Sequence, residues 1–287
     1  MSSGTLADMK IARLLIVLLL AACAPLGRLE AQQPRPYRIL VTNDDGVRAP
    51  GLAAVAQVLQ AIGDVSIVAP ADNQTASSQS LNTTQPIFRQ DLTLPNGLRA
   101  VGLTATPATT VQVGIKNIVA PRPDLVVSGI NPGLNLGFSA YLSGTVGAAR
   151  QAVMDGVPAI AASLAAEGAP RDFVAAAEEV LGVARRVKEH GLPPLTLLNV
   201  NIPAVPAEGY KGYEVTTAAP LRAGVETFAE AKHPSGRTLY WSVYKEGATA
   251  PQGSDAWAVE HGFVAVTPLH VGESDTAAAG VVREWFR

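Results

Sequence analysis

Two adjacent carboxylates, Asp44 and Asp45, follow closely on the apolar run Ile39 to Val41. Neighbouring carboxylates repel each other, so a cation, hydrogen bonds or protonation must offset the cost. Oxygen ligands of this kind suit Mg²⁺, Mn²⁺ or Ca²⁺. An ordinary solvated turn is also rich in Asn, Asp and Gly. Taken alone, the pattern "NDDG" therefore leaves a metal site and a plain turn as alternatives.

A second polar cluster, "SGINPGLNLGFSAYLSGTV" at residues 128–146, follows another apolar run and leads into a helical stretch. The helix is expected to begin near Ser143, Gly144 and Thr145. Free N–H groups and the dipole at a helix N-terminus attract phosphate, and the hydroxyls of Ser143 and Thr145 can add hydrogen bonds. Capping alone would also explain either hydroxyl. This loop predicts an anion site, with simple capping as the alternative.

A third loop, "APADNQTASSQS" at residues 69–80, offers Asn73, Thr75, Ser77 and Ser78. By itself it is an ordinary polar loop. If all three loops meet at one edge of a sheet, they combine paired carboxylates, neutral oxygen ligands and phosphate donors. These are the components of metal-assisted phosphate hydrolysis. The sequence has no P-loop lysine pattern.

The elements that must position these loops alternate along the chain from Tyr37 onward. Short apolar runs predict strands at residues 37–42, 64–70, 98–103, 124–129, 157–163, 196–202 and 262–269. Amphipathic stretches predict helices at residues 51–62, 109–119, 145–155 and 172–190, with a short helix near 255–260. This alternation is typical of an α/β domain with a mostly parallel sheet, whose ligands bind beyond the carboxyl ends of the strands.

The C-terminal third has a different character. Residues 210–247 contain two β-rich arms around the turn residues Pro234 to Gly236, which predicts a hairpin excursion. Residues 272–287 are expected to form a C-terminal tail. Four histidines do not have metal-ligand spacing, so we expect surface or capping roles for them.

Composition limits the chemistry. The chain has 287 residues, 48% of them hydrophobic, and a net charge of -2, which indicates a globular protein with a large core. The lack of a Lys/Arg run argues against a nucleic-acid polymer or an anionic membrane as the main partner. Cys23 is the only cysteine, which excludes disulfides, thiolate metal sites and a cysteine nucleophile in the mature domain.

Residues 1–31 predict an export signal. Basic residues precede the apolar run Leu14 to Ala22, which is too short to span a membrane comfortably. The segment Leu20 to Cys23, "LAAC", resembles the lipobox of bacterial lipoproteins, in which the cysteine becomes the lipidated first residue. Cleavage after Ala31 and a retained anchor are the alternatives. We expect an exported, periplasmic protein, either lipid-anchored through Cys23 or free.

Five sequence blocks resemble the SurE family of metal-dependent phosphatases, which act on nucleoside monophosphates. They are "ILVTNDDGVRAPGL", "IVAP", "PDLVVSGINPGLNLG", "SGTVGAA" and "GFVAVTPL", in the family's order and spacing. The resemblance covers residues 37–271. It implies a Rossmann-like sheet with helices on both faces and a protruding C-terminal hairpin at residues 210–247 that makes oligomer contacts, and hence a homodimer or homotetramer.

The resemblance also implies the site residues and the reaction, which is hydrolysis of nucleoside 5'- or 3'-monophosphates. One divalent ion per subunit, Mg²⁺ or Mn²⁺, would be held by Asp44, Asp45, Asn131 and Thr75, the last where the family usually has Ser. The substrate phosphate would be bound by Asn135, Ser143, Gly144 and Thr145. Either aspartate would also serve as base. A covalent aspartyl-phosphate route is the mechanistic alternative.

Three segments depart from the family pattern and leave other functions open. Asp72 and Gln74 stand where the family has basic residues. The family's "GTP.DC" segment is "ATPATT" at residues 105–110, and residues 138–145 lack the acidic residues that commonly precede "YSGT". Two alternatives are an exported phosphate-binding protein without turnover and a phosphatase for polyphosphate or another phosphate ester.

Overall fold

The computed structural model describes residues 35–165, 172–204, 209–220, 225–244, 250–272 and 276–286. The chain divides into two units, Met1–Arg35 and Pro36–Arg287. The expected export signal and Cys23 lie outside the described residues. None of the helices in the described ranges has both the length and the apolar character that crossing a bilayer requires.

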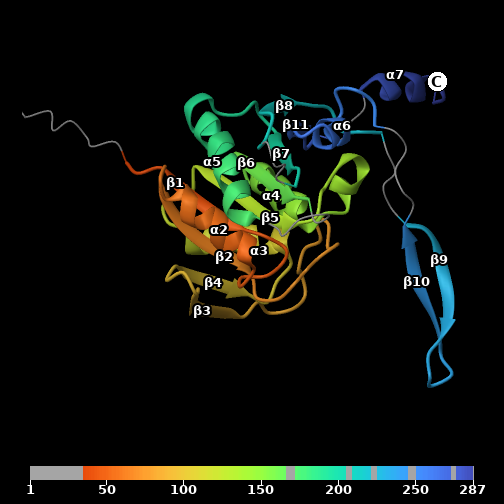
Figure 1. The fold of residues 1–287 in the computed structure, drawn as a ribbon, viewed down its shortest axis with the longest axis horizontal. Helices are drawn as coiled ribbons and strands as arrows, with labels where there is room; N and C mark the ends of the chain where they lie inside the picture. Colours follow the sequence, from red (N-terminus) through yellow and green to blue (C-terminus); the bar gives the residue numbers. More distant parts are fainter. Residues whose placement is uncertain are drawn as a thin grey trace, which may run out of the picture. The chain divides into compact units, whose positions relative to one another are not determined.

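Within the described residues, nine strands form one mixed sheet (Figure 1). The parallel part contains, in spatial order, β4 (Arg99–Leu103), β2 (Asp64–Pro70), β1 (Arg38–Thr42), β5 (Leu125–Pro132), β6 (Ala159–Leu164) and β7 (Thr196–Ile202). One edge adds antiparallel β3 (Arg89–Thr93), and the other adds β11 (Val264–His270), antiparallel to β7, and then β8 (Tyr213–Val215). The predicted α/β fold with a mostly parallel sheet is confirmed.

Helices cover both faces of this sheet. On one face, α2 (Pro50–Leu59) packs beside α5 (Phe173–His190), and on the other α3 (Pro107–Val113) packs beside α4 (Gly144–Met154). Both faces need a cover because apolar side chains of strand β1 alternate between them. Ile39 and Val41 join the core under α2 and α5, whereas Leu40 joins the core under α3 and α4. A strand buried on both faces reads as a continuous apolar run.

The order of the strands reverses at β1. One side of β1 pairs with β2 and the other side pairs with β5, although β3 and β4 intervene in the sequence. In open α/β sheets, ligands bind in the crevice beyond the carboxyl ends of the strands at such a switch point. Asp44 and Asp45 directly follow β1, and Asn131 lies at the end of β5. The topology therefore brings the first two polar clusters to the same crevice.

Several predicted elements form with other bounds or as another helix type, and one short helix forms as predicted. The helix predicted at residues 109–119 starts at Pro107, since proline fits the first turn of a helix, and becomes a π-helix, η1 (Gly114–Ile118). The loop before α4 contains a 3₁₀ turn, η2 (Gly137–Tyr141). The predicted short helix forms as α6 (Asp255–Glu260). The segment expected as a tail contains α7 (Thr276–Glu284).

The predicted hairpin also forms. Strands β9 (Val225–Lys232) and β10 (Thr238–Tyr244) pair antiparallel with each other as a separate two-stranded sheet. Three large side chains on these strands, Phe228, Tyr240 and Trp241, are 60–68% exposed. The register places Glu230 opposite Tyr240 and Ala229 opposite Trp241, and side chains this exposed contribute little to a core.

Candidate functional site

The carboxylate of Asp44 is buried at the N-terminus of α4, with only 2% of the residue exposed. The Thr145 hydroxyl donates to Asp44 Oδ1 at 2.5 Å. Burial raises the pKa of the Asp44 carboxyl above its ordinary value, and hydrogen bonds from Thr145 and from the backbone of Gly144 lower that pKa only in part. The dipole and first N–H groups of a helix stabilise a negative charge at this position. The N-terminus of α4, which the sequence predicts to bind phosphate, therefore already contacts the Asp44 carboxylate of the same chain.

Gly144 allows a close approach at the same point. A Cβ there would lie 2.8 Å from Asp44 Oδ2 and 2.8 Å from Ser77 Oγ, which is closer than side-chain carbons come to oxygen. A larger residue would push the carboxylate and the hydroxyl away from the helix. Ser143 caps α4, because its hydroxyl oxygen accepts a hydrogen bond from the backbone N–H of Val146 at 3.2 Å.

The third loop, residues 69–80, is hydrogen-bonded to the loop after β1 and to η2, and it contacts α4. The backbone N–H of Gln74 donates to the Asp44 carbonyl at 2.6 Å, and the Ser78 hydroxyl donates to the Tyr141 carbonyl at 2.6 Å. A Cβ at Gly147 would lie 2.1 Å from the Ser78 carbonyl oxygen, so α4 and the loop touch backbone to backbone. The predicted meeting of the three loops is therefore present in this structure.

Two hydroxyls of this loop have different surroundings. Thr75, the expected metal ligand, is exposed, and its backbone N–H donates to Asn73 Oδ1 at 2.9 Å. The Ser77 hydroxyl is buried and lacks a hydrogen-bond partner among the described residues. Left-handed backbone at Ala76 (φ 62°) and Ser78 (φ 53°) turns Ser77 inward. Sequence reasoning counted Ser77 only among the polar residues of the loop, and nothing in the sequence marks two non-glycine residues for φ above zero.

Asn131 and Asn43 add amide oxygens to the crevice. The Asn131 Nδ2 donates to the Gly133 carbonyl at 2.6 Å, which leaves its Oδ1 as the free acceptor of that amide. The Asn43 Nδ2 donates to the Gly46 carbonyl at 3.0 Å, while its Oδ1 is buried with no partner in the described part of the chain. Both amides thus keep an oxygen rather than a nitrogen for a further partner.

Strand β5 is irregular just before Asn131. The peptide bond between Gly129 and Ile130 is cis, and the pairing register with β6 shifts between Ser128 and Asn131. Gly129 has φ 133°, and a Cβ there would lie 2.3 Å from the Ala162 carbonyl oxygen. Only glycine fits both the backbone conformation and the space.

Asn135 belongs to a second network on the neighbouring strand ends. Its Nδ2 donates to the Ser163 hydroxyl, its backbone N–H donates to Asn201 Oδ1 and its carbonyl accepts from the Asn199 amide, each at 2.8 Å. Asn199 and Asn201 lie on β7, and both are almost fully buried. Sequence reasoning missed these three partners. The pattern "NVN" inside a buried strand could have revealed two of them, Asn199 and Asn201, because a buried amide needs a polar partner.

The donors around Asp44 fit a hard cation. Asp44 Oδ2, the half-buried Asp45 and the unpaired Ser77 hydroxyl are all oxygen groups in one crevice. Within the described ranges, no three residues among His, Cys, Asp and Glu gather as a metal-binding group. Mg²⁺ and Mn²⁺ need few protein carboxylates, since hydroxyls, amide oxygens and water complete their coordination. The residues present therefore suit such an ion and do not suit a zinc site.

The fold and the site define a Rossmann-like α/β protein with an oxygen-donor crevice at its switch point. Residues 39–224 match the family described as survival protein SurE. The chain is 40% identical over 249 residues to the 5'-nucleotidase SurE of Geotalea uraniireducens, covering 86% of this chain and 98% of that protein. It is 36% identical over 255 residues to the 5'-nucleotidase SurE of Coxiella burnetii, covering 87% and 95% respectively.

Solved structures agree with the sequence relatives. The crystal structure of the SurE protein from Aquifex aeolicus superimposes with a TM-score of 0.76 at 34% identity. The match covers 87% of this chain and 100% of that chain. The chain belongs to the SurE family, which confirms the resemblance found in its sequence blocks.

Proposed function

We propose that this protein is a metal-dependent nucleotidase that hydrolyses nucleoside 5'-monophosphates to nucleoside and phosphate. The observation that carries the proposal is the buried Asp44 carboxylate, held by Thr145 and the start of α4 at the switch point of the sheet. Relatives named 5'-nucleotidase SurE, at 40% identity over 86% of the chain, support the same activity. Hydrolysis of 3'-monophosphates is part of the proposal as the second substrate class.

One divalent cation per subunit, Mg²⁺ or Mn²⁺, belongs to this proposal. Asp44, Asp45, Asn131 and Thr75 are the ligands that the family resemblance implies, and the Ser77 hydroxyl beside Asp44 is a further ligand that we expect to contribute more than Thr75. When bound, the cation neutralises charge on the phosphate and polarises it toward attack by water. Placement of the ion would also offset the repulsion between the two carboxylates.

The protein groups have separate tasks in this proposal. Thr145 fixes the direction of the Asp44 carboxylate through its 2.5 Å hydrogen bond. Asp45 is less buried than Asp44, so it is the carboxylate that takes a proton from the attacking water. Asn135, Ser143, Gly144 and Thr145 would bind the substrate phosphate around the start of α4. Asn135 is fixed for this role by its bonds to the ends of β6 and β7.

A phosphate-release assay tests the activity. Nucleoside 5'- and 3'-monophosphates, polyphosphate and a phosphosugar are compared in Mg²⁺, Mn²⁺ and EDTA, for the parent and for Asp45→Asn. Asp64→Asn is the matched control, because Asp64 is exposed at the opposite end of the sheet, where β2 starts. We expect metal-dependent release from 5'-monophosphates that Asp45→Asn abolishes. Activity indifferent to both EDTA and Asp45→Asn would refute the proposal.

The same assay separates the alternatives. A binding protein without turnover would bind AMP and release no phosphate in any metal. A phosphatase of other specificity would prefer polyphosphate or the phosphosugar. Trapping by beryllium fluoride would favour an aspartyl-phosphate route, whereas attack by water predicts that the fluoride inhibits no better than phosphate does.

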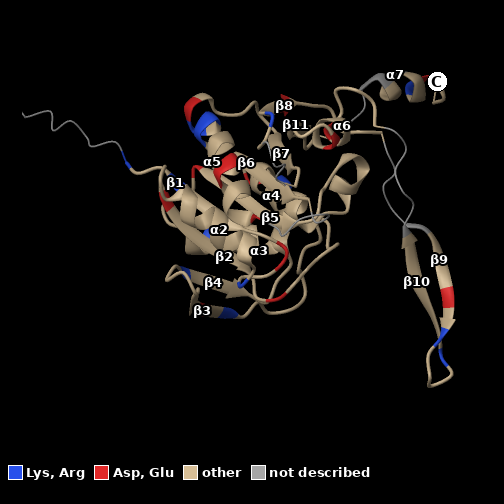
Figure 2. Cartoon of the chain, in the orientation of Figure 1, with Lys and Arg blue, Asp and Glu red and all other residues tan. Residues whose placement is uncertain are grey.

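The small-molecule substrate agrees with the distribution of charge. Lys and Arg residues are spread over the described elements and do not form a basic stripe along any one of them (Figure 2). Nucleic-acid polymers bind to concentrated positive surfaces. We therefore propose a nucleotide, and not a polymer, as the partner of the crevice.

Export to the periplasm and assembly are two further parts of the proposal. The lipobox-like segment ending at Cys23 supports a lipid anchor, and labelling with a palmitate analogue, with Cys23→Ser as the control, tests it. Phe228, Tyr240 and Trp241, exposed on β9 and β10, support oligomer contacts by the hairpin. Light scattering on the parent and on Trp241→Ser should distinguish a dimer or tetramer from a monomer.

A further inference from the structure

A second buried charge lies on α4, away from the candidate catalytic crevice. Arg150 is only 9% exposed, and its guanidinium carbon lies 5.4 Å from the centre of the Tyr141 ring. Ion pairs in the described part of the chain involve other residues, and none reaches Arg150. No nitrogen of Arg150 is among the fully buried, unpartnered polar atoms of the described residues, so the guanidinium reaches open space without a carboxylate partner. The ring face compensates only a fraction of the lost hydration.

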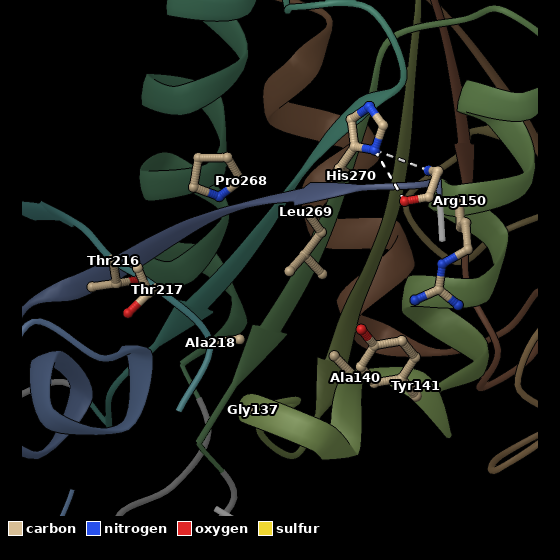
Figure 3. A pocket seen from close by; sticks show the side chains of 11 residues that line it. Gly137, Ala140, Tyr141, Arg150, Thr216, Thr217, Ala218, Pro268, Leu269 and His270 are labelled. Carbon is tan, nitrogen blue, oxygen red and sulfur yellow. Dashed lines mark hydrogen bonds between the residues drawn. The ribbon is translucent and has the colours of Figure 1, made fainter. Parts of the chain in front are cut away.

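The guanidinium lines a pocket of ≈ 780 Å³ between α4, η2 and the end of β11. Figure 3 shows the Arg150 side chain extending from α4 toward Tyr141, with Leu269 across the pocket. Among the described residues that line it, Arg150 is the only one that carries a permanent charge, and none of them is acidic. Thr217 contributes an exposed hydroxyl on the far side. The pocket is therefore positive at one end and polar or apolar elsewhere.

The lining also contains a polar and an apolar half. Pro268, Leu269 and Ala140 present apolar surface, while His270 has its Nδ1 engaged by Gly272, whose backbone N–H lies 3.0 Å away. The Nδ1 of His270 is thus occupied locally, and Arg150 is the permanently charged group that can bind an anion. Pockets of some 300–1,000 Å³ accommodate small organic ligands. The space is larger than a bare phosphate needs.

We propose that this pocket, which we call the Arg150 pocket, binds a small molecule that carries a phosphate group. Arg150 pairs with the phosphate, since a guanidinium forms two parallel hydrogen bonds with such an oxyanion, and the apolar half receives the organic part. The site is distinct from the crevice at Asp44. Arg150 lies five residues after Thr145, about 7–8 Å further along the helix axis, and the pocket lining includes none of the residues proposed to bind the metal.

AMP binding in EDTA tests this site without turnover. Isothermal titration compares AMP with uncharged adenosine for the parent, Arg150→Met and Arg186→Met. Arg186 is the matched control, because it also lies over a tyrosine ring, Tyr213, at 4.7 Å, but is exposed. We expect Arg150→Met to weaken AMP binding about tenfold or more and to leave adenosine binding unchanged. Arg186→Met should bind AMP as the parent does. Equal AMP binding by the parent and Arg150→Met would overturn the proposal.

Thermal unfolding provides a second readout that separates binding from folding. In phosphate-free buffer, Arg150→Met should melt within a few degrees of the parent, because the arginine makes no ion pair among the described residues. Adding inorganic phosphate should raise the Tm of the parent and of Arg150→Lys but not of Arg150→Met. A large fall in the Tm of Arg150→Met in that buffer would show that the arginine is already bound within the folded chain and would refute the site.

These outcomes are independent of the proposed nucleotidase activity. Asp45→Asn should lose phosphate release while keeping the AMP binding in EDTA that depends on Arg150. If Asp45→Asn leaves turnover intact, the proposed function fails and the Arg150 pocket stands. If Arg150→Met binds AMP as the parent does, the pocket proposal fails and the proposed function stands.

Discussion

Two side chains of opposite charge and low exposure, Asp44 and Arg150, lie at helix α4, and the chain compensates the two charges differently. The Asp44 carboxylate at the start of the helix accepts hydrogen bonds from Thr145 and from the backbone of Gly144. The Arg150 guanidinium, further along, has a tyrosine ring but no carboxylate partner among the described residues. A charge that the chain hydrogen-bonds is fixed in place for chemistry even where burial is only partly offset, whereas a charge without such bonds can take a partner from solution.

The largest expected effect is on turnover. Asp44→Asn keeps the size and the hydrogen bond from Thr145 but removes the charge that a cation needs. Phosphate release from AMP should fall about 10³-fold or more, because the ligand and its field are lost together. Steady-state kinetics in saturating Mn²⁺ measures this. A variant with near-parental kcat would show that the buried carboxylate is structural only.

Thr145→Val should have the next largest effect. It keeps the shape of the side chain and removes the donor to Asp44 Oδ1, which is 2.5 Å away. Loss of a hydrogen bond to a charged buried group costs about 1.5–3 kcal/mol, so we expect kcat to fall about tenfold to a hundredfold. Thr145→Ser retains the hydroxyl and should restore most of the activity. Equal loss in both variants would mean that packing, and not the hydrogen bond, determines the effect.

Substitutions of Thr75 and Ser77 in the third loop show which of their hydroxyls contributes more to metal binding. The family resemblance assigns Thr75 to the metal, whereas Ser77 is the hydroxyl beside Asp44 in this structure. We expect Ser77→Ala to weaken Mn²⁺ binding by about tenfold and Thr75→Ala to weaken it less. Electron paramagnetic resonance of free Mn²⁺ measures both, with exposed Ser80→Ala as the control. The reverse order would restore Thr75 as the nearer ligand.

The smallest effect concerns stability and its dependence on pH. Because burial raises the pKa of Asp44 in the folded state, folding favours the protonated form. Its contribution to stability is present below the unfolded pKa and is lost as the pH rises through the folded pKa. Metal-free Asp44→Asn should therefore melt a few degrees above the parent at about pH 7 and lose that advantage in acid. A lower Tm at neutral pH would contradict this account of the carboxylate.

The sequence predicts the buried framework well and the irregular backbone poorly. Strands β1, β5 and β6 each contain a short apolar run, and the turn "NDDG" follows the first of them, so both the sheet and the aspartates could be located. Edge strand β3 is mostly exposed, with burial limited to Leu92, and therefore has no apolar run to reveal it. The position of Ser77 depends on left-handed backbone at Ala76 and Ser78, which the residue types do not encode.

The charge of Arg150 illustrates the same limit. In sequence it is one arginine in an apolar helix, and the spacing of α4 gives no reason to separate it from an exposed residue. Its 9% exposure and its place over the Tyr141 ring come from the folded chain. Long-range packing between elements distant in sequence determines which charges need a partner.

The central claim is that Asp44 and Asp45 hold a divalent cation on which hydrolysis of AMP depends. Titrating the EDTA-treated protein with Mn²⁺, while following phosphate release from AMP, tests it most directly. We predict activity that rises from the background and saturates at about one ion per subunit, and no such rise for Asp45→Asn. Full activity before any Mn²⁺ is added, or the same titration curve for Asp45→Asn, would contradict the claim.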